Sequence, residues 1–232
     1  MFETNFVRVP TNGIRLNVAQ AGPANGPLLI FLHGFPEFWY GWRNQIEHFA
    51  TLGYRVWAPD QRGYNLSDKP DAISDYTLDT LASDIVGLID AAGCARARVV
   101  GHDWGAAVTW WLALKHPERV ERAVILNVPH PAVMGRMLSR SFSQLLKSWY
   151  MFFFQIPRLP EAVIQRNHYA AAARSLVATS RPGTFSQADL DRYIEAWSRT
   201  DGLRTMIHWY RAIGQKPSRM GNPRVRVPLL MI

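Results

Sequence analysis

Apolar residues in the first half of the chain fall into short continuous runs, each about as long as a buried strand. Residues 27–32, 55–59, 98–101 and 123–126 form four such runs. Continuous runs of this length are typical of the central strands of a parallel sheet, because those strands are buried on both faces. We therefore expect four core strands.

Helical patterns separate these runs at residues 42–51, 78–92 and 105–116. In the second pattern, Leu81 and Ile85 are two members of an apolar series that recurs every three or four positions on one helix face. This alternation of strand and helix predicts the α/β class, with a twisted and mostly parallel sheet.

A hairpin is expected before the first core strand. Residues 6–9 and 14–19 have strand character, and the Thr11-Asn12-Gly13 sequence between them is a turn signal.

The alternation stops after residue 131. From 133 to 220 the pattern is helical and rich in aromatic residues and methionine, and residues 225–232 return to strand character. A helical insertion between two strands, lying over the edge of the sheet where ligands bind, is the simplest account. The sequence thus predicts an α/β core at 1–131, a helical cap at 132–222 and the start of a returning core strand at 223–232.

Composition limits the partners and the compartment. The 232 residues are 48% hydrophobic and carry a net charge of +8, but only four of the 26 basic residues are lysine, and the arginines are dispersed. We therefore expect no nucleic-acid partner. No apolar run reaches the roughly 18 residues of a membrane span, and no signal peptide is recognisable, so no membrane partner is expected. The single cysteine, Cys94, fits a cytoplasmic protein without disulfides.

Residues 99–105 are typical of a strand that turns sharply into a helix, with Asp103 at the corner. Gly101 and Gly105 allow the tight turn of a nucleophile elbow, in which aspartate here takes the usual place of serine. A carboxylate suits displacement at a saturated carbon through an alkyl-enzyme ester, rather than ester or amide cleavage. Helix amides should favour its ionised form. The alternative is an ordinary N-cap aspartate.

The loop after the central strand, residues 33–36, is expected to face this elbow. In such folds the loop and the residue after the nucleophile donate two backbone N–H groups to an oxyanion hole, which assigns the donors to Phe35 and Trp104. A plain turn is the alternative interpretation of the loop, because Gly-x-Pro sequences are frequent in turns.

Other residues of this region are candidates for substrate contact. His33, Pro36 and Trp39 are assigned to substrate binding, although loop organisation explains His33 and hydrophobic packing explains Trp39 about as well. No Cys, His, Asp or Glu cluster has the spacing of a metal site, and no cofactor is expected.

Several motifs resemble those of the α/β-hydrolase-fold epoxide hydrolases, and the resemblance extends over nearly the whole chain. They are HGFPEFWYGWR at 33–43, DQRGY at 60–64 with SDKP at 67–70, and GHDWG at 101–105. The resemblance implies a small-molecule epoxide as substrate and a diol as product. One departure is Asn65, where the family often has glycine.

The resemblance also implies that two cap tyrosines bind and protonate the epoxide oxygen. One lies four residues before a Phe-Gln pair, which makes it Tyr150, and the other lies in a Trp-Tyr-Arg run, which makes it Tyr210. A phenol suits this role because it stays neutral at pH 7 and can still donate its proton to an alkoxide. Packing within an aromatic cap is the alternative.

The family completes its reaction with a histidine and a carboxylate that activate water after the cap. The sequence ends at residue 232, where the first returning strand begins, and Asn127 stands at the alternative position of the acid. We therefore expect a truncated chain that forms the ester on Asp103 once without turnover, or a partner that completes the sheet. A homodimer is left open.

Two other functions stay open. A haloalkane or haloacid dehalogenase also uses an elbow aspartate followed by tryptophan, so Trp104 does not discriminate. Against it, Phe35 lacks the halide-binding amide that haloalkane dehalogenases commonly have there, and Ala107 stands where fluoroacetate dehalogenases have arginine. A non-catalytic, truncated hydrolase is the third interpretation.

Overall fold

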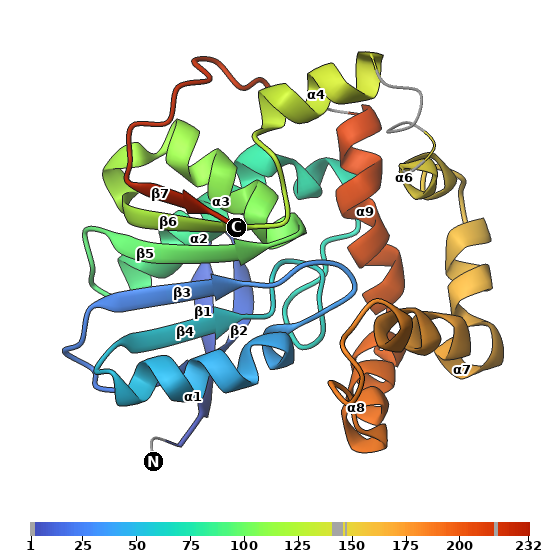
Figure 1. Ribbon diagram of the computed structural model, residues 1–232, viewed down its shortest axis with the longest axis horizontal. Helices are drawn as coiled ribbons and strands as arrows, with labels where there is room; N and C mark the ends of the chain where they lie inside the picture. Colours follow the sequence, from blue (N-terminus) through green and yellow to red (C-terminus); the bar gives the residue numbers. More distant parts are fainter. Residues whose placement is uncertain (1–2, 141–145, 147, 216–217) are drawn as a thin grey trace.

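One seven-stranded sheet carries the fold in the computed structural model, which describes residues 3–140, 146, 148–215 and 218–232 (Figure 1). The strands are β1 (Asn5–Thr11), β2 (Ile14–Ala21), β3 (Leu28–Leu32), β4 (Arg55–Pro59), β5 (Ala97–His102), β6 (Val120–Leu126) and β7 (Leu229–Met231). Their order is β1-β2-β4-β3-β5-β6-β7. The pairs β1–β2 and β2–β4 are antiparallel, and the remaining pairs are parallel. The predicted α/β class is confirmed.

Helices cover both faces of the sheet. They are α1 (Arg43–Thr51), α2 (Leu78–Ala91) and α3 (Trp104–Lys115), with short 3-10 turns at η1 (Trp39–Trp42), η2 (Ile73–Tyr76) and η3 (Pro117–Arg119). All five residues of β3 are buried, as expected for a strand covered on both faces. Leu29 and Phe31 share a buried cluster with α1, whereas Ile30 and Leu32 belong to the larger cluster with α2 and α3.

The N-terminal hairpin forms where the turn signal lies. Asn12 and Gly13 adopt φ values of 41° and 78° between β1 and β2. Asparagine and glycine tolerate this left-handed conformation better than other residues, which is why they mark such turns.

Further helices lie between β6 and β7 along the chain, beside the C-terminal ends of the parallel strands (Figure 1). They are α4 (Pro131–Arg140), α6 (Trp149–Phe153), α7 (Leu159–Ala178), α8 (Gln187–Ser198) and α9 (Gly202–Gln215). We call residues 131–215 the cap. The exact division of the chain at 132 and 223 stays a prediction.

Side-chain to backbone hydrogen bonds hold the cap against the core loops. On α9, the Trp209 indole donates to the Arg62 carbonyl at 3.0 Å, and the Thr205 hydroxyl donates to the Gly63 carbonyl at 2.6 Å. On α8, the Trp197 indole donates to the Pro36 carbonyl at 2.6 Å. These contacts fix α9 over the loops that follow the central strands.

The returning strand is shorter than the pattern predicted. Strand character was expected from 225 to 232, but β7 covers only Leu229–Met231 and pairs with β6. Pro228 precedes it, and proline has no N–H to donate to a ladder, so the strand begins after that residue.

Candidate active site

The turn between β5 and α3 places Asp103 at the edge of the sheet in a strained conformation, with φ 50° and ψ −119°. The two flanking glycines are required by space. A Cβ atom on Gly105 would lie 2.1 Å from the Leu32 carbonyl oxygen, and one on Gly101 would lie 2.2 Å from the Gly105 carbonyl oxygen. The chain can therefore make this turn only with glycine at both positions.

Two backbone amides meet at the Asp103 carboxylate. Oδ1 accepts a hydrogen bond of 2.9 Å from the Phe35 amide, and the amide of Trp104, the first residue of α3, also hydrogen-bonds the carboxylate. Asp103 occupies the N-cap position of α3, but its side chain makes no capping hydrogen bond. The two amides expected to form an oxyanion hole therefore both lie at this carboxyl group.

Burial raises the pKa of Asp103 above its ordinary value. The amides of Phe35 and Trp104 and the nearby His102 act in the opposite direction but do not outweigh it. The expectation that helix amides would favour the ionised form identified a real contribution, but it omitted the larger cost of desolvating the charge.

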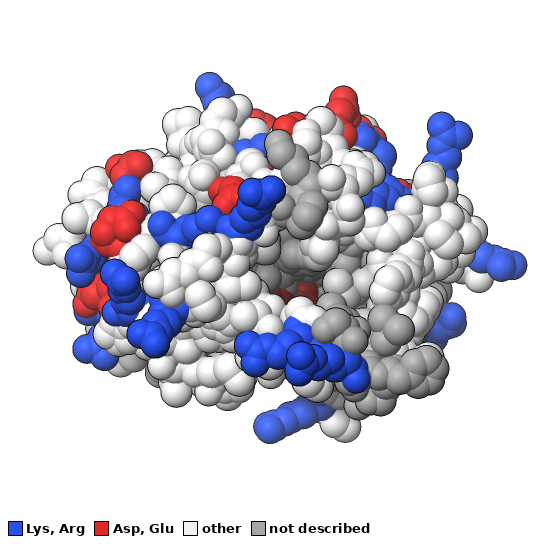
Figure 2. All heavy atoms as spheres, turned by 90° about the horizontal axis from the view of Figure 1, so that it is seen from above, with Lys and Arg blue, Asp and Glu red and all other residues white. Residues whose placement is uncertain are grey.

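Asp103 lies on the wall of a cavity of about 350 Å³. Most of the lining is aromatic or aliphatic, and it comes from the core loops, α3 and the cap. The lining residues are Tyr76, Thr77, Leu78, Asp103, Trp104, Ala107, Trp111, Val128, Pro129, Pro131, Met134, Gly135, Tyr150, Met151, Trp209, Tyr210, Ala212, Ile213, Ser218 and Met220. Figure 2 shows a hollow between the core and the cap, with acidic atoms visible at its floor.

The cavity also receives both tyrosines singled out in the cap. Tyr150 lies on α6 and Tyr210 on α9, and their ring centroids are 6.0 Å apart. Tyr210 is buried and packs edge-on against Trp104 at 5.0 Å, whereas Tyr150 is 38% exposed. Burial raises the pKa of both phenols, and the negative charge of Asp103 raises them further. Both hydroxyls therefore keep their protons at neutral pH.

Reciprocal hydrogen bonds tie the two tyrosine motifs together. The Gln155 side chain donates to the Tyr210 carbonyl at 2.9 Å, and the Arg211 side chain donates to the Phe154 carbonyl at 3.0 Å. Arg211 also forms a largely buried ion pair with Glu161 at 2.6 Å. A side chain from each tyrosine motif thus binds the backbone of the other motif, which ties α6 to α9 at the cavity.

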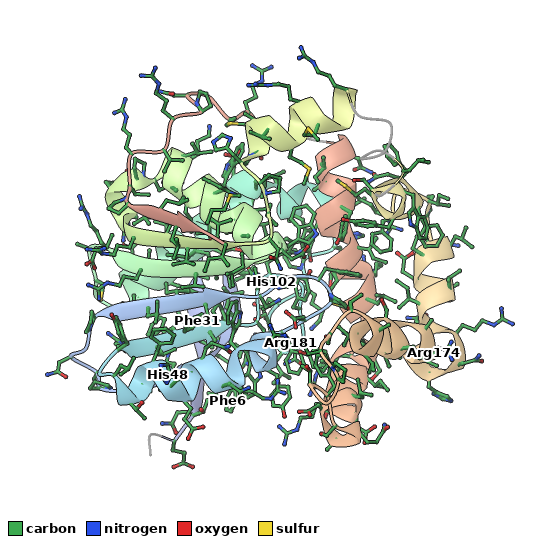
Figure 3. The ribbon with its side chains drawn as sticks, in the orientation of Figure 1. Phe6, Phe31, His48, His102, Arg174 and Arg181 are labelled. Carbon is green, nitrogen blue, oxygen red and sulfur yellow. The ribbon has the colours of Figure 1, made fainter. Side chains whose placement is uncertain are left out.

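A second polar group borders the site at the end of β5. His102 lies between the sheet and the cap in Figure 3, and its Nδ1 is 3.4 Å from Oε2 of Glu37. The hydrogen bond to Glu37 raises the pKa of His102, against the effect of burial. Tyr193 of α8 donates to the same carboxylate at 3.3 Å. This group links the core loop to the cap beside the nucleophile candidate.

The three residues expected to contact substrate lie elsewhere. Among the described residues that line the cavity, His33, Pro36 and Trp39 are not found. His33 is fully buried, its Nε2 accepts from the Gln61 amide at 3.0 Å, and burial lowers its pKa to about 4. Pro36 receives the Trp197 indole of the cap, and Trp39 packs against Phe6 at 4.8 Å. The contacts that the structure shows for these residues organise the loop and its surroundings, and a contact with substrate stays a prediction.

Several residues that line the cavity were not anticipated. Val128 and Pro129 follow β6, and the end of a parallel strand was the available signal for them. Ile213 lies three residues after Tyr210 on one face of α9, a spacing that could also have been used. Met134 had no such signal. In the part of the chain that the structure describes, no group of acidic, histidine and cysteine side chains could hold a metal ion.

Comparison with known proteins shows the family to which this chain is similar. Residues 27–199 match the protein family described as the alpha/beta hydrolase fold. The chain is 49% identical over 215 residues to AB hydrolase superfamily protein YfhM of Bacillus subtilis, covering 90% of this chain and 75% of that protein. It is 38% identical over 213 residues to epoxide hydrolase 4 of Mus musculus, covering 90% of this chain and 59% of that protein.

Solved structures give the same result. Epoxide hydrolase VrEH1 from Vigna radiata is 33% identical, with a TM-score of 0.84 over 99% of this chain and 79% of that one. A mutant of an epoxide hydrolase from Bacillus megaterium is 30% identical, with a TM-score of 0.86 over 98% of this chain and 81% of that one. In both matches the described chain is nearly all covered, while about a fifth of the other protein is not.

Proposed function

The chain belongs to the α/β-hydrolase family and is similar to its epoxide hydrolases, and we propose that it opens epoxides through an ester between a substrate carbon and Asp103. One observation carries the proposal. A single cavity holds the Asp103 carboxylate together with the Tyr150 and Tyr210 side chains. Ring opening needs a nucleophile on one side of the epoxide and a proton donor on the other, and these three groups supply both.

The ring-opening step balances with the groups of this cavity. The Phe35 and Trp104 amides hold the Asp103 carboxylate, and one of its oxygens attacks an epoxide carbon. The new carbon–oxygen bond forms as the ring carbon–oxygen bond breaks, and the electron pair of that bond passes to the ring oxygen. A tyrosine hydroxyl then gives its proton to that oxygen. An alkoxide is a stronger base than a phenolate, so a phenol of raised pKa can still protonate it.

The apolar lining indicates the class of epoxide. Apart from Asp103, the described lining carries no charged side chain, and its polar groups are the phenols, the indoles, Thr77 and Ser218. Placing an ionised substrate group against such a wall costs free energy that nothing there compensates. We therefore expect uncharged epoxides with an aliphatic or aromatic substituent, small enough for a cavity of about 350 Å³.

Release of a diol requires a second step, in which water cleaves the ester on Asp103. The oxyanion that forms on the carboxyl carbon would be stabilised by the Phe35 and Trp104 amides, which already hydrogen-bond the carboxylate. The resemblance places the water-activating histidine and its acid after the strand that β7 begins. The proposal for residues 1–232 accordingly concerns ester formation.

A dehalogenase would use the same carboxylate but a different partner for the leaving group. Two indole N–H groups at this cavity are already engaged, because Trp111 donates to Asp79 at 2.8 Å and Trp209 donates to the Arg62 carbonyl at 3.0 Å. The paired phenols favour a leaving oxygen that needs a proton over a halide that needs none.

The proposal is tested by offering the chain styrene oxide and 1-chlorohexane in parallel. We expect covalent capture or diol formation with the epoxide and no chloride release from the haloalkane. Chloride release without any reaction of the epoxide would instead assign the site to dehalogenation. Absence of both reactions in a folded protein would support a non-catalytic role.

A further inference from the structure

The outer side of the cap exposes a row of large apolar side chains. Trp149 and Phe152 on α6 are 62% and 58% exposed, and Ile156, Leu159 and Val163 along the following turn and the start of α7 are 44%, 46% and 47% exposed. They lie on two helices and on the turn between them, since α6 ends at Phe153 and α7 begins at Leu159. Figure 1 shows α6 and α7 at the edge of the cap farthest from the sheet. We call these five residues the cap apolar surface.

Residues 149–163 thus leave five large apolar side chains between 44% and 62% exposed. Soluble monomers rarely expose contiguous apolar patches of more than a few hundred Å², and larger ones mark binding surfaces. The short helix α6 has residues that line the cavity and residues that are exposed to solvent. Tyr150 and Met151 line the cavity, whereas Trp149 and Phe152 face outward. The exposed residues are therefore additional to the side of α6 that builds the active-site wall.

The exposed charged residues of this segment have one sign. Arg158, Arg166 and Arg174 are exposed on the same segment, and in Figure 3 Arg174 extends away from the molecule. Within residues 148–178, all of which the structure describes, Glu161 is the one acidic residue, and it is largely buried in its ion pair with Arg211. The segment from Trp149 to Arg174, which turns where the backbone of α7 is non-helical at 166–169, thus exposes both large apolar groups and guanidinium groups.

This combination points to one kind of partner. We propose that the cap apolar surface docks on the surface of an anionic phospholipid bilayer, with Trp149 and Phe152 entering the interface and the three arginines contacting lipid phosphates. Interfacial helices use this arrangement of tryptophan, phenylalanine and leucine beside basic residues. Each arginine near an anionic leaflet contributes about 1 kcal/mol, equivalent to about fivefold in binding.

Two alternatives, a helix that spans the bilayer and pairing with a second copy of the chain, fit this surface less well. Among the described residues no helix is long and apolar enough to pass through a bilayer, so the proposed contact is peripheral. Face-to-face pairing of two copies would bring their arginines together, and within the described residues 148–178 the one acidic side chain, Glu161, is already paired with Arg211. The bilayer surface supplies the missing negative charge. The sequence-based expectation of no membrane partner considered only spanning segments and signal peptides.

Vesicle flotation tests the proposal directly. The 232-residue protein is mixed with vesicles of phosphatidylcholine alone or of phosphatidylcholine with phosphatidylglycerol, at about 0.1 M and about 1 M salt. We expect flotation with the anionic vesicles and its loss at high salt, where the screening length falls from about 10 Å to about 3 Å. Equal flotation with both kinds of vesicle, or none with either, would overturn the proposal.

Variants distinguish binding through the cap apolar surface from nonspecific binding of the protein to vesicles. W149S and F152S should each weaken binding to anionic vesicles about tenfold, because burying one such side chain contributes that much or more. R158Q, R166Q and R174Q together should weaken it about a hundredfold. The matched controls L52S, at the exposed end of α1, and R122Q, on β6, should bind like the unaltered protein.

Two further measurements exclude misfolded variants and self-association as explanations of the result. Circular dichroism must show that each variant melts like the unaltered chain, and any variant that does not is replaced by W149Q or F152Q. Sedimentation velocity is run without lipid on the unaltered protein and on F152S. A dimer that F152S dissociates would show that this face binds a second copy and would overturn the proposal, as would variants that float like the unaltered protein.

Discussion

The Phe35 amide donates a hydrogen bond of 2.9 Å to Oδ1 of Asp103, a residue 68 positions further along the chain. The parallel pairing of β3 with β5 makes this contact possible, because it brings the loop after one strand beside the turn after the other. Gly34 allows this close approach of the loop to Asp103. A Cβ atom there would lie 2.4 Å from the Asp103 Cβ and 2.6 Å from its Oδ1.

The first prediction follows from this close approach. G34A should displace the Asp103 carboxylate and slow ester formation by about a hundredfold, the cost of moving a reacting group by about 1 Å. The rate is measured by quenched-flow mass spectrometry with styrene oxide. G202A is the control, because the nearest atom to its added Cβ is 3.4 Å away. An unchanged rate in G34A would show that this contact does not position the nucleophile.

A second prediction concerns the paired phenols. Y150F and Y210F should each slow ester formation by about tenfold or more, and the double variant should lose a factor of about 10² to 10⁴, the usual contribution of a general acid. Y54F is the control, since Tyr54 packs against Phe49 far from the cavity. If both single variants react as fast as the unaltered protein, the phenols only pack and the epoxide assignment loses its proton donor.

A third prediction concerns pH. Only the ionised carboxylate attacks, and burial raises the pKa of Asp103 above 3.8. The rate of ester formation should therefore fall on acidification with a midpoint above 3.8, at a higher pH than for an exposed aspartate. His102 lowers the pKa of Asp103 through its positive charge, so H102Q should move that midpoint further upward. Circular dichroism at each pH excludes unfolding, and a downward shift in H102Q would contradict the prediction.

A fourth prediction tests the link between the two tyrosine motifs. Q155L keeps the size of the side chain but removes the hydrogen bond to the Tyr210 carbonyl, so ester formation should slow severalfold. The same amide group also donates to the Met151 carbonyl at 3.2 Å, so the loss of both hydrogen bonds should lower the free energy of unfolding by about 2 kcal/mol. In a Y150F background the kinetic effect of Q155L should largely disappear, because the two changes act on the same pair. Full additivity would mean that Gln155 only stabilises the cap.

The framework of the site could be predicted from sequence because it depends on local rules. Continuous apolar runs located the parallel strands, and glycines on either side of Asp103 located the turn whose backbone tolerates no side chain there. The position of a loop after a strand end then predicted that Phe35 would face Asp103, because parallel strands end at the same edge of a sheet.

The features of the site that the sequence did not predict depend on tertiary packing. Trp39 was expected at the substrate, but Phe6 from the N-terminal hairpin packs against its ring, and a sequence pattern does not show such a partner. The bond from Gln155 to the Tyr210 carbonyl joins residues 55 positions apart, with no periodicity to indicate it. The raised pKa of Asp103 depends on how completely the cap covers it, which is again a property of the folded chain.

Covalent labelling of Asp103 tests the central claim most directly. The chain is mixed with styrene oxide in H₂¹⁸O, quenched at short times and digested, and the peptide containing Asp103 is examined by mass spectrometry beside that of D103N. We predict either the mass of one added epoxide on Asp103 or, where water has cleaved the ester, ¹⁸O in its carboxylate, with neither in D103N. An epoxide that disappears while Asp103 gains neither label, or that reacts equally with D103N, would contradict the account.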